Sequence, residues 1–441
     1  MDALRIGLAI AATLALPALR SNAQIYDTNG VVVQTFAGSG FAGHVDGVGQ
    51  ETMFISPEAI VADSSGNLFV ADGNYLRKIT PDGTVSTFAG NGDTAPFGNT
   101  GSATDVSLVS YAICSMAIDH SNALWITIAA NTGTTGRRLG FLLRIGDNTN
   151  VWWMNLSSNF TSVDSFGVCV DSGNNVYYSD YFGNTIYRYH PASGAKEVFA
   201  GSGNEGSADG NGIFTSFNAP AALACDAADN IYVWDSANFL IRRINQNRDV
   251  VTIAGKQSLF SSPNADGVGT NASFSFIHSM WIDNFGNVML ACGQAIFNSS
   301  FMGSGSSIRK MDVATNVVTI AGSFSGTGYT NGAGNRARFN GSSGVCVSGG
   351  TIYVADSNNY RIRSITNNPT AQLVLPANLH LNIYSGLQIV GTVGRTYQVQ
   401  SSPDMANWTT RATLLLTSSP YLWIDQNPVS GNKFYRALLL P

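Results

Sequence analysis

Four aspartates recur at the same place in successive β-rich segments of the chain. Carboxylates repeated in this way could hold a hard cation such as calcium. Each of them is followed, however, by a short segment that contains asparagine or glycine, and a carboxylate at that place can accept backbone N–H bonds and fix a turn. We therefore interpret the four as structural caps of turns: Asp72, Asp180, Asp235 and Asp356.

A second repeated position, just before the first strand of each repeat, holds more varied side chains. In chain order it is occupied by Glu58, Cys114, Phe166, Ala221, His278 and Ser343. If the repeats surround an axis, this position lies near one mouth of a central channel, where Glu58, Cys114, His278 and Ser343 would converge. Glu58 and His278 are the two that could bind a divalent metal, and their alternative role is ordinary polar lining of the channel.

Motifs of nucleophilic or phosphate chemistry are absent from the sequence. It contains neither a G-x-S-x-G nucleophile elbow nor an H-E-x-x-H segment. Three Asp-Gly-x-Gly segments open no helix, so their amides build no phosphate site, and we interpret them as turns between repeats. They are Asp46–Gly49, Asp209–Gly212 and Asp266–Gly269. We therefore predict no catalytic residue and favour a non-enzymatic function.

Composition limits the class of protein and of partner. The chain is 44% hydrophobic and 12% charged, which supplies a large core and argues against disorder. Its 47 glycines favour many short strands joined by tight turns. The net charge of −5, without any lysine or arginine run, excludes nucleic acid as a partner.

The N-terminus has the pattern of a signal peptide. Arg5 precedes the apolar run Ile6–Leu19, and small residues at Ser21 and Ala23 predict cleavage before Gln24. No later segment approaches about 20 apolar residues, so we expect an exported mature chain without a membrane span. The five cysteines form no CxxC pair, and we expect free thiols rather than disulfides: Cys114, Cys169, Cys225, Cys292 and Cys346.

The elements that position these side chains form a repeat of four short strands. Its clearest copy consists of Pro57–Asp63, Leu68–Asp72, Tyr75–Ile79 and Thr84–Gly90, each a β-branched or aromatic run bounded by turn residues. The copy can be followed six times, and four antiparallel strands make one blade of a β-propeller. The recurring third strand contains, in order, Arg77, Arg144, Arg188, Arg242, Arg309 and Arg363.

The ends of the repeat predict how the ring closes. A copy of the fourth strand, Val31–Gly38, precedes the first full repeat, whereas the sixth repeat lacks its own copy. We therefore expect the N-terminal strand to complete the last blade, which leaves few open sheet edges. The prediction is an all-β protein with a six-bladed propeller.

Several segments of the repeat resemble NHL repeats. They include Gly66–Asp72 (GNLFVAD) and Tyr353–Ile365 (YVADSNNYRIRSI), and the resemblance covers about residues 31 to 366. Units two and five depart from the pattern through the insertions Asn131–Gly136 and Asn298–Ser307, which are either binding loops or tolerated insertions. The resemblance implies a rigid propeller that presents loops to a ligand.

Lactonases of the gluconolactonase type are also six-bladed, and they hold a divalent metal in the channel with a glutamate at the start of the first blade. Glu58 resembles that glutamate. The asparagine and aspartate partners of the lactonase site have no convincing counterparts here. A metal-dependent lactonase or hydrolase is therefore the alternative function, and the cofactor expectation is none unless a divalent metal binds.

The C-terminal segment has a different composition and forms a separate prediction. Alternating runs at Leu379–Ile383, Leu387–Ile389, Tyr397–Ser401, Ala412–Leu416 and Phe434–Leu438 predict half-buried strands. We expect a signal peptide at 1–23, the propeller at 24–366, and a small β-sandwich-like module at 367–441 that either attaches the protein to a surface or supports the propeller.

These observations favour an exported binding scaffold. We expect a monomer whose partner is an extracellular or periplasmic protein, peptide or glycan. A purely structural surface protein is a third alternative, because fold by itself does not assign function.

Overall fold

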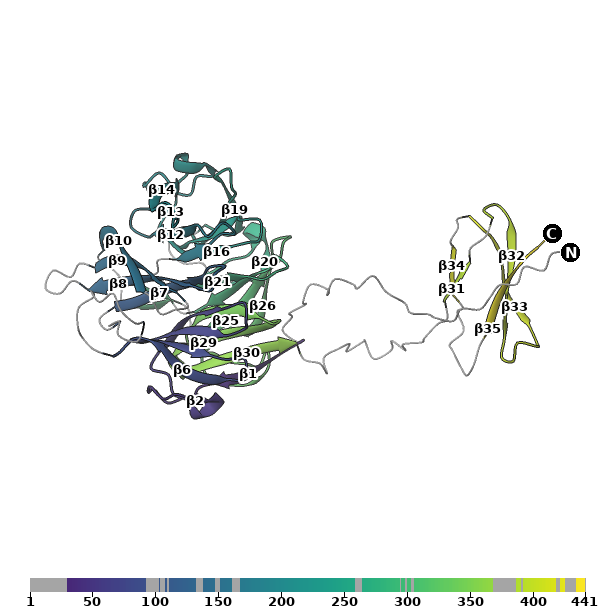
Figure 1. Cartoon of the computed structure of the whole chain (residues 1–441). Helices are drawn as coiled ribbons and strands as arrows, with labels where there is room; N and C mark the ends of the chain where they lie inside the picture. Colours follow the sequence, from purple (N-terminus) through teal and green to yellow (C-terminus); the bar gives the residue numbers. More distant parts are fainter. Residues whose placement is uncertain are drawn as a thin grey trace. The chain divides into compact units, whose positions relative to one another are not determined.

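The computed structural model divides the chain into two compact units, Met1–Gln372 and Leu373–Pro441 (Figure 1). The structure describes residues 30–92, 103, 108, 111–131, 138–146, 151–160, 167–257, 264–293, 295–297, 300–302, 305–367, 386–389, 392–417, 421–424 and 434–440. The predicted signal peptide lies outside these residues, as do Phe166 and most of the two insertions. Within them no helix is long and apolar enough to cross a membrane.

The described part of the first unit is built from strands and three-residue 3-10 turns, which confirms the all-β prediction. Six sheets of four or five antiparallel strands make it up. Sheet I consists of β2 (Gly47–Val48), β6 (Thr84–Ala89), β5 (Tyr75–Ile79), β4 (Leu68–Asp72) and β3 (Pro57–Ala62). Sheet II consists of β10 (Val151–Phe160), β9 (Arg138–Ile145), β8 (Leu124–Asn131) and β7 (Tyr111–Ile118). Sheet III consists of β14 (Ala195–Ala200), β13 (Thr185–His190), β12 (Val176–Asp180) and β11 (Val168–Val170).

The other three sheets follow the same order from the outside inward. Sheet IV consists of β15 (Gly210–Asn211), β19 (Asp249–Gly255), β18 (Leu240–Ile244), β17 (Ile231–Asp235) and β16 (Pro220–Cys225). Sheet V consists of β20 (Gly267–Val268), β26 (Asn316–Ser323), β25 (Ser306–Met311), β22 (Val288–Cys292) and β21 (Ile277–Ile282). Sheet VI consists of β27 (Gly332–Ala333), β1 (Val31–Ala37), β30 (Arg361–Asn367), β29 (Thr351–Asp356) and β28 (Ser342–Ser348). A hairpin of β23 (Ala295–Phe297) and β24 (Ser300–Met302) extends sheet V's loop, and the 3-10 turns are η1 (Gly49–Glu51), η3 (Gly212–Phe214), η4 (Ser236–Asn238), η5 (Gly269–Asn271) and η6 (Ser357–Asn359).

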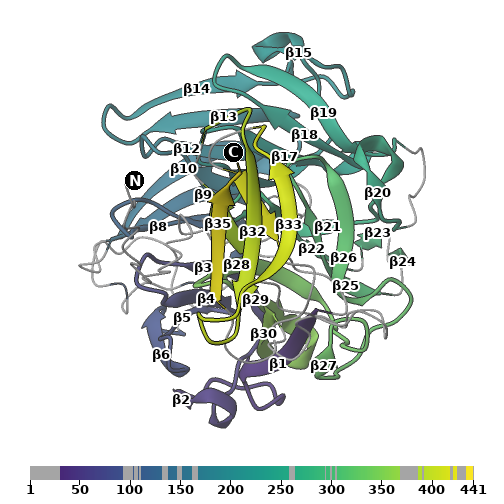
Figure 2. The same ribbon diagram turned by 90° about the vertical axis from the view of Figure 1, so that its right-hand side faces the viewer.

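The six sheets surround a common centre (Figure 2). Their innermost strands contact one another in a closed cycle, in the order β3, β7, β11, β16, β21, β28 and back to β3. Each sheet presents one face to each neighbour, so strands such as β4 are buried along their whole length. This arrangement is a β-propeller, and it explains why the strands are apolar on both faces rather than on alternate residues.

The N-terminal strand closes the ring as predicted. β1 pairs antiparallel with β30, with Val31 opposite Asn367 and Val33 opposite Ile365. Val31 and Val33 are fully buried in the cluster that joins sheets V and VI. The chain therefore fastens its first strand into the sheet that holds its last propeller strand, and this leaves the edge of β30 covered.

Five of the inner hairpins are fixed by an aspartate at the end of the innermost strand. In sheet I, Asp63 accepts N–H bonds from Ser65 at 2.9 Å and from Asn67 at 2.8 Å. The same pair of bonds recurs at Asp119, Asp171, Asp226 and Asp283. The aspartates that mark the repeat in the sequence are thus turn-forming residues.

The second unit contains two small sheets. One pairs β31 (Gly386–Ile389) with β34 (Tyr421–Ile424), and the other orders β33 (Thr409–Leu415), β32 (Thr396–Ser402) and β35 (Phe434–Leu439). Its core is small, with Val399 and Leu416 fully buried. Of the predicted strands, Leu379–Ile383 lies outside the described residues.

Candidate functional site

The predicted channel-mouth position corresponds to a β-bulge in the innermost strands. In β21, Ile277 pairs with Cys292 and Ser279 with Ala291, so His278 is the extra residue of the bulge. The same shift leaves Cys114 as the extra residue of β7 and Ser343 as that of β28.

Two other inner strands are irregular at the equivalent position. In β3 the register shifts between Pro57 and Ile60, which places Glu58 in the irregular segment, and in β16 it shifts between Pro220 and Leu223. A bulge redirects a side chain out of the regular alternation of a strand and is common next to functional sites. The sequence alignment therefore identified a position with a common backbone irregularity.

Glu58 and Ser343 belong to bulges that touch each other. Ser343 Oγ donates a 3.0 Å hydrogen bond to the carbonyl oxygen of Glu58, which joins sheet VI to sheet I. The Glu58 carboxylate accepts a hydrogen bond from Ser56 Oγ at 3.2 Å. Glu58 reaches solvent, but desolvation by the surrounding mouth raises the pKa of its carboxyl, with Ser56 opposing and the Asp72 carboxylate adding to the rise.

His278 and Cys114 lie in their own bulges at other points of the ring. The His278 ring packs edge-on against Phe276, with centroids 4.6 Å apart, and it lies close against the backbone of Gly293. Cys114 is half-buried. All five cysteines are free in the structure, and Cys169, Cys292 and Cys346 are buried.

The donor set of the bulges does not fit the metal site of a lactonase. The equivalent positions hold one carboxylate, one imidazole, one thiol, one hydroxyl and, at Ala221, no ligand at all, whereas hard divalent cations take six or more oxygen ligands. Among the described residues no group of three or more His, Cys, Asp or Glu side chains could hold a metal ion. We derive no chemical step through a metal.

Most of the side chains that line the channel are apolar. Its cavity measures about 130 Å³ and is lined by the six innermost strands. Met116 and Met280 are buried there, and Trp281 packs into the apolar clusters on either side of it.

Three of the four second-strand aspartates accept backbone N–H bonds from a segment other than the predicted turn, whereas Asp180 caps the turn that follows it. Asp72 accepts N–H bonds from Ile55 at 2.6 Å and from Ser56 at 2.8 Å, so it fixes the segment before the innermost strand rather than the turn that follows it. Asp235 and Asp356 bond in the same way to the amides of Asn218 and Asn340. The turn that follows is capped at Asp180, which accepts the Gly183 N–H at 2.8 Å.

Three of these aspartates each form an ion pair with a buried arginine, a role that the sequence analysis did not predict. Arg77, Arg242 and Arg363 are fully buried and ion-paired with Asp72, Asp235 and Asp356 at 2.7–3.0 Å. Arg77 and Arg242 also reach a second carboxylate, Asp46 and Asp209 respectively. The Asp-Gly-x-Gly segments are thus more than turns between repeats, because their aspartates bind the arginines and their glycines enter the short outer strands β2, β15 and β20.

Sheets II and III break this pattern through a change of register. Ile79 ends β5 opposite Leu68, and Ile145 ends β9 opposite Leu124, so Leu143 rather than Arg144 occupies the place of Arg77. The same comparison places Tyr187, not Arg188, at that point of sheet III. Because successive side chains of a strand point to opposite faces, Arg144 and Arg188 project from the other face of their sheets.

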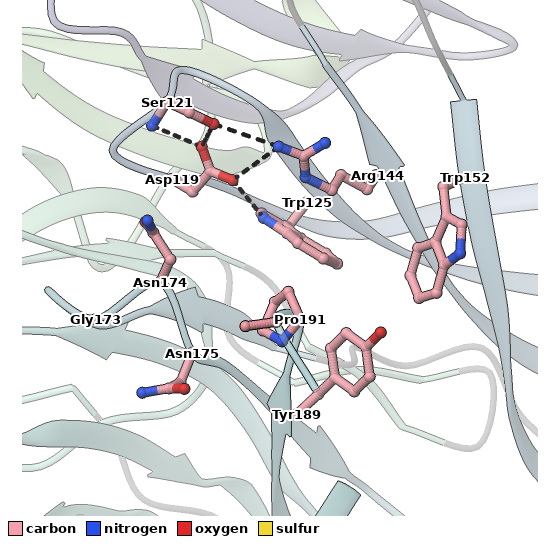
Figure 3. A pocket seen from close by; sticks show the side chains of 11 residues that line it. Asp119, Ser121, Trp125, Arg144, Trp152, Gly173, Asn174, Asn175, Tyr189 and Pro191 are labelled. Carbon is pink, nitrogen blue, oxygen red and sulfur yellow. Dashed lines mark hydrogen bonds and ion pairs between the residues drawn. The ribbon is translucent and has the colours of Figure 1, made fainter. Parts of the chain in front are cut away.

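A cavity lies between sheets II and III (Figure 3). It measures about 630 Å³. Trp125, Arg144 and Trp152 are cross-strand neighbours on β8, β9 and β10, which places them in one row on the face that sheet II turns towards it. Sheet III contributes Tyr189 from the end of β13. We call this cavity the II/III cleft.

One wall of the II/III cleft is aromatic. Trp152 stacks on Tyr189 with centroids 5.7 Å apart and an interplanar angle of 17°. The buried Trp125 meets both rings edge-on at 6.1 Å. Trp152 remains 42% exposed, so this supported ring presents apolar surface to solvent.

The other wall of the II/III cleft is polar (Figure 3). The buried Asp119 carboxylate accepts hydrogen bonds from Ser121 N–H at 2.9 Å and from Trp125 Nε1 at 3.0 Å. Although burial opposes it, these donors keep the pKa of Asp119 below its ordinary value. Asn174 and Asn175 come from the inner hairpin of sheet III, and Asn174 Oδ1 accepts the His120 N–H of sheet II at 3.1 Å.

Sequence analysis did not single out the residues of the II/III cleft. The cleft depends on which face Trp125, Arg144 and Trp152 occupy, and a one-residue error in alignment reverses that face. The available signal was the departure of unit two from the repeat, together with the pair Trp152–Trp153 in its fourth strand.

Comparisons with known proteins agree with this architecture. The model of the NHL repeat matches residues 339–363, which span β28, β29 and the start of β30. Human NHL repeat-containing protein 2 is 24% identical over 361 residues, covering 78% of this chain and 43% of the human protein. The chain thus spans less than half the length of that relative.

Solved structures from Bacteroides share the fold. A protein of unknown function from Bacteroides thetaiotaomicron has a TM-score of 0.55 at 17% identity, covering 77% of this chain and 76% of that one. An auxiliary nutrient binding protein from the same species has a TM-score of 0.52 at 16% identity, with 76% of each chain covered. One from Bacteroides ovatus has a TM-score of 0.50 at 16% identity, with 78% of each covered. Strand order and these similarities together show a β-propeller fold that contains an NHL-repeat match at residues 339–363.

Proposed function

We propose that this chain is an extracytoplasmic binding protein and not an enzyme, and that its propeller holds a glycan, peptide or protein ligand in the II/III cleft. The protein acts as a rigid scaffold, because the ring of sheets fixes both walls of the cleft before a ligand arrives. Preorganised walls reduce the ordering cost of binding.

The observation that supports this proposal is the composition of the cleft. Its volume of about 630 Å³ falls within the usual range of about 300–1,000 Å³ for small-molecule sites. It combines an exposed tryptophan, held in place by two other rings, with nearby carboxylate, amide and guanidinium groups. Apolar surface with a few fixed polar groups is the usual make-up of a recognition site.

The alternatives have less support. The lactonase alternative needs asparagine and aspartate ligands beside the glutamate, and the bulge positions hold neither residue type. The channel below the bulges is lined mostly by apolar side chains. The description of two structures of this fold as auxiliary nutrient binding proteins is consistent with a binding role outside the cytoplasm.

A pair of neighbouring tryptophans on β10 allows a sharp test. We would probe glycan and peptide arrays with the full chain and then measure the best ligand by calorimetry. Trp152→Ala should weaken binding at least tenfold, because burial of one large aromatic face contributes about 1.5–3 kcal/mol. Trp153→Ala is the matched control, since Trp153 points to the opposite face and packs on Phe141.

Two results would contradict the proposal. If Trp152→Ala bound the best ligand as well as the wild type while Glu58→Ala lost it, the site would lie at the channel mouth. If the purified protein hydrolysed lactones or esters and Glu58→Ala removed that activity, the enzymatic alternative would replace the binding function.

A further inference from the structure

Arg144 differs from the buried arginines of the propeller in what surrounds its guanidinium group. Arg77, Arg242 and Arg363 are fully buried and use both terminal nitrogens in short hydrogen bonds. Arg144 is 36% exposed at its side chain, and only its Nη2 atom bonds, to Asp119 at 3.5 Å and to Ser121 Oγ at 3.3 Å. In the described part of the chain, its Nη1 and Nε atoms donate no hydrogen bond.

Asp119 leaves part of the positive charge of the Arg144 guanidinium unpaired. The carboxylate already accepts Ser121 N–H, Ser121 Oγ, Ala123 N–H and Trp125 Nε1 at 2.6–3.0 Å, and its contact with Arg144 is the longest of the set. Asp119 is buried, whereas the guanidinium reaches the cavity. The cleft therefore presents a cation with two available donor atoms to a ligand.

The polar wall supplies a further donor. Asn174 Oδ1 is occupied by His120 N–H, and within the described structure its Nδ2 group has no partner. Ser121 Oγ accepts from Arg144 and donates to Asp119, so it adds no further donor. Donors still predominate on this wall, so it suits a ligand rich in oxygen acceptors and carrying negative charge.

The aromatic wall limits the ligand further. Trp152 presents an exposed ring beside Arg144 on the same face of sheet II, and its position is fixed by Tyr189 and Trp125. A sugar ring has one face of C–H groups that packs on a flat aromatic surface while its hydroxyls and substituents point sideways to hydrogen-bond donors. A sugar whose exocyclic group is a carboxylate matches both walls, because the guanidinium fork pairs with a carboxylate in two parallel bonds.

From this geometry we infer that the II/III cleft binds an acidic saccharide, a hexuronate residue of a glycan, with its ring on Trp152 and its carboxylate on Arg144. The inference rests on the proposed binding function and specifies its ligand class. Arg144 is then the residue that distinguishes acidic from neutral sugars, whereas Trp152 serves both.

The test compares two sugars that differ in the carboxylate alone. The full chain is titrated with trigalacturonate and with the neutral trisaccharide of the same linkage in which each carboxylate is a hydroxymethyl group. We expect the wild type to bind the acidic sugar roughly tenfold tighter or more, because a charge-assisted hydrogen-bond pair is lost with the neutral one. Arg144→Gln should remove this preference by weakening the acidic sugar far more than the neutral one, and Arg144→Lys should restore part of it.

A matched control comes from the register of the sheets. Arg243 occupies in sheet IV the strand position that Arg144 occupies in sheet II, and it is exposed away from the cleft. Arg243→Gln should keep the preference, so a general change of surface charge would be distinguished from loss of the site. Thermal unfolding of each variant verifies that it is folded.

The outcomes separate the ligand class from the binding function. Equal affinity of the wild type for both sugars, or a preference that survives in Arg144→Gln, would overturn the inference and leave the binding function standing if Trp152→Ala still abolished binding. Binding of succinate as tight as that of trigalacturonate would overturn the saccharide assignment. Failure of the wild type to bind either sugar would also overturn it, and the array experiment would then decide the binding function separately.

Discussion

Arg242 shows what the repeated ion pairs do for the propeller at the scale of one residue. Its guanidinium lies over the Phe217 ring, contacts Asp235 and Asp209, and donates to the carbonyl oxygens of Ser216 and Ala208. Removing two charges from water is costly, so the pair as a whole adds little stability, but the loss of one partner leaves the other charge buried and unpaired. The ion pair therefore fixes the positions of its side chains rather than adding net stability.

The first prediction follows from this asymmetry. Asp235→Ala should lower the free energy of unfolding by about 3–5 kcal/mol, because Arg242 would lose its fully buried partner. Chemical denaturation measures the change. Asp180→Ala is the control at the same strand position in sheet III, where Tyr187 replaces the arginine, and its cost should be clearly smaller. Equal losses in the two variants would contradict this account of the ion pair.

At the scale of elements, Glu197 joins two sheets. It lies on β14 of sheet III, bonds to Arg188 of the neighbouring strand, and reaches Arg248 in the hairpin between β18 and β19 of sheet IV at 2.9 Å. Partial burial would raise its pKa, but the hydrogen bonds from Arg188, Arg248 and His190 prevail and lower it to about 2.

The second prediction is the pH dependence of this contact. Because the pKa of Glu197 is lower in the folded state, its stabilising contribution is present above the unfolded value of 4.5 and is lost as pH falls towards 2. Stability should therefore fall less steeply between these pH values in Glu197→Gln than in the wild type. The exposure of the group keeps the difference small. Parallel curves from denaturation at several pH values would refute it.

The third prediction concerns how closely neighbouring innermost strands approach. A Cβ atom on Gly344 of β28 would lie 2.3 Å from the carbonyl oxygen of Glu58 in β3, and backbone there cannot move aside easily. Gly344→Ala should cost about 1–3 kcal/mol through overpacking, measured by denaturation. Gly326→Ala serves as control, since a Cβ there meets nothing within 4 Å and should be nearly neutral. A neutral Gly344→Ala would show that the bulges can separate.

At the scale of the whole molecule, the ring depends on one strand from the beginning of the chain. β1 fills the place between β27 and β30, and its Val33 is fully buried against Ile365 and its neighbours. An open ring would expose an edge strand to pairing with other molecules.

The fourth prediction tests this closure. Val33→Asp should destabilise the propeller severely, by roughly 3 kcal/mol or more, and promote aggregation on heating, because it buries an unpaired charge in the closing strand. Val251→Asp on β19 is the control, since Val251 is exposed. Light scattering during thermal unfolding would detect the difference. If the two variants behaved alike, closure by β1 would not limit stability.

The sequence by itself determined the architecture of this protein, because a pattern that recurs several times can be recognised even where single copies deviate from it. Five of the six copies have an aspartate at the same turn, such as Asp63 and Asp119, so one clear copy locates the weaker ones. The missing fourth strand of the last copy and the extra one at Val31–Gly38 sufficed to predict the closure that the pairing of β1 with β30 confirms. The bulge position was also visible, although its backbone shape was not.

Tertiary structure alone decided which side chains meet. A shift of one residue in β9 and β13 places Arg144 and Arg188 on the other sheet face from the buried arginines. No local sequence pattern indicates such a shift, because both registers place an apolar residue next to an arginine. The cleft of Trp125, Arg144, Trp152 and Tyr189 arises where two sheets face each other across residues far apart in sequence. The local sequence determines which segments form strands. The face that a side chain occupies depends on strand register and on packing between sheets, and the chain fixes both only when the ring is closed.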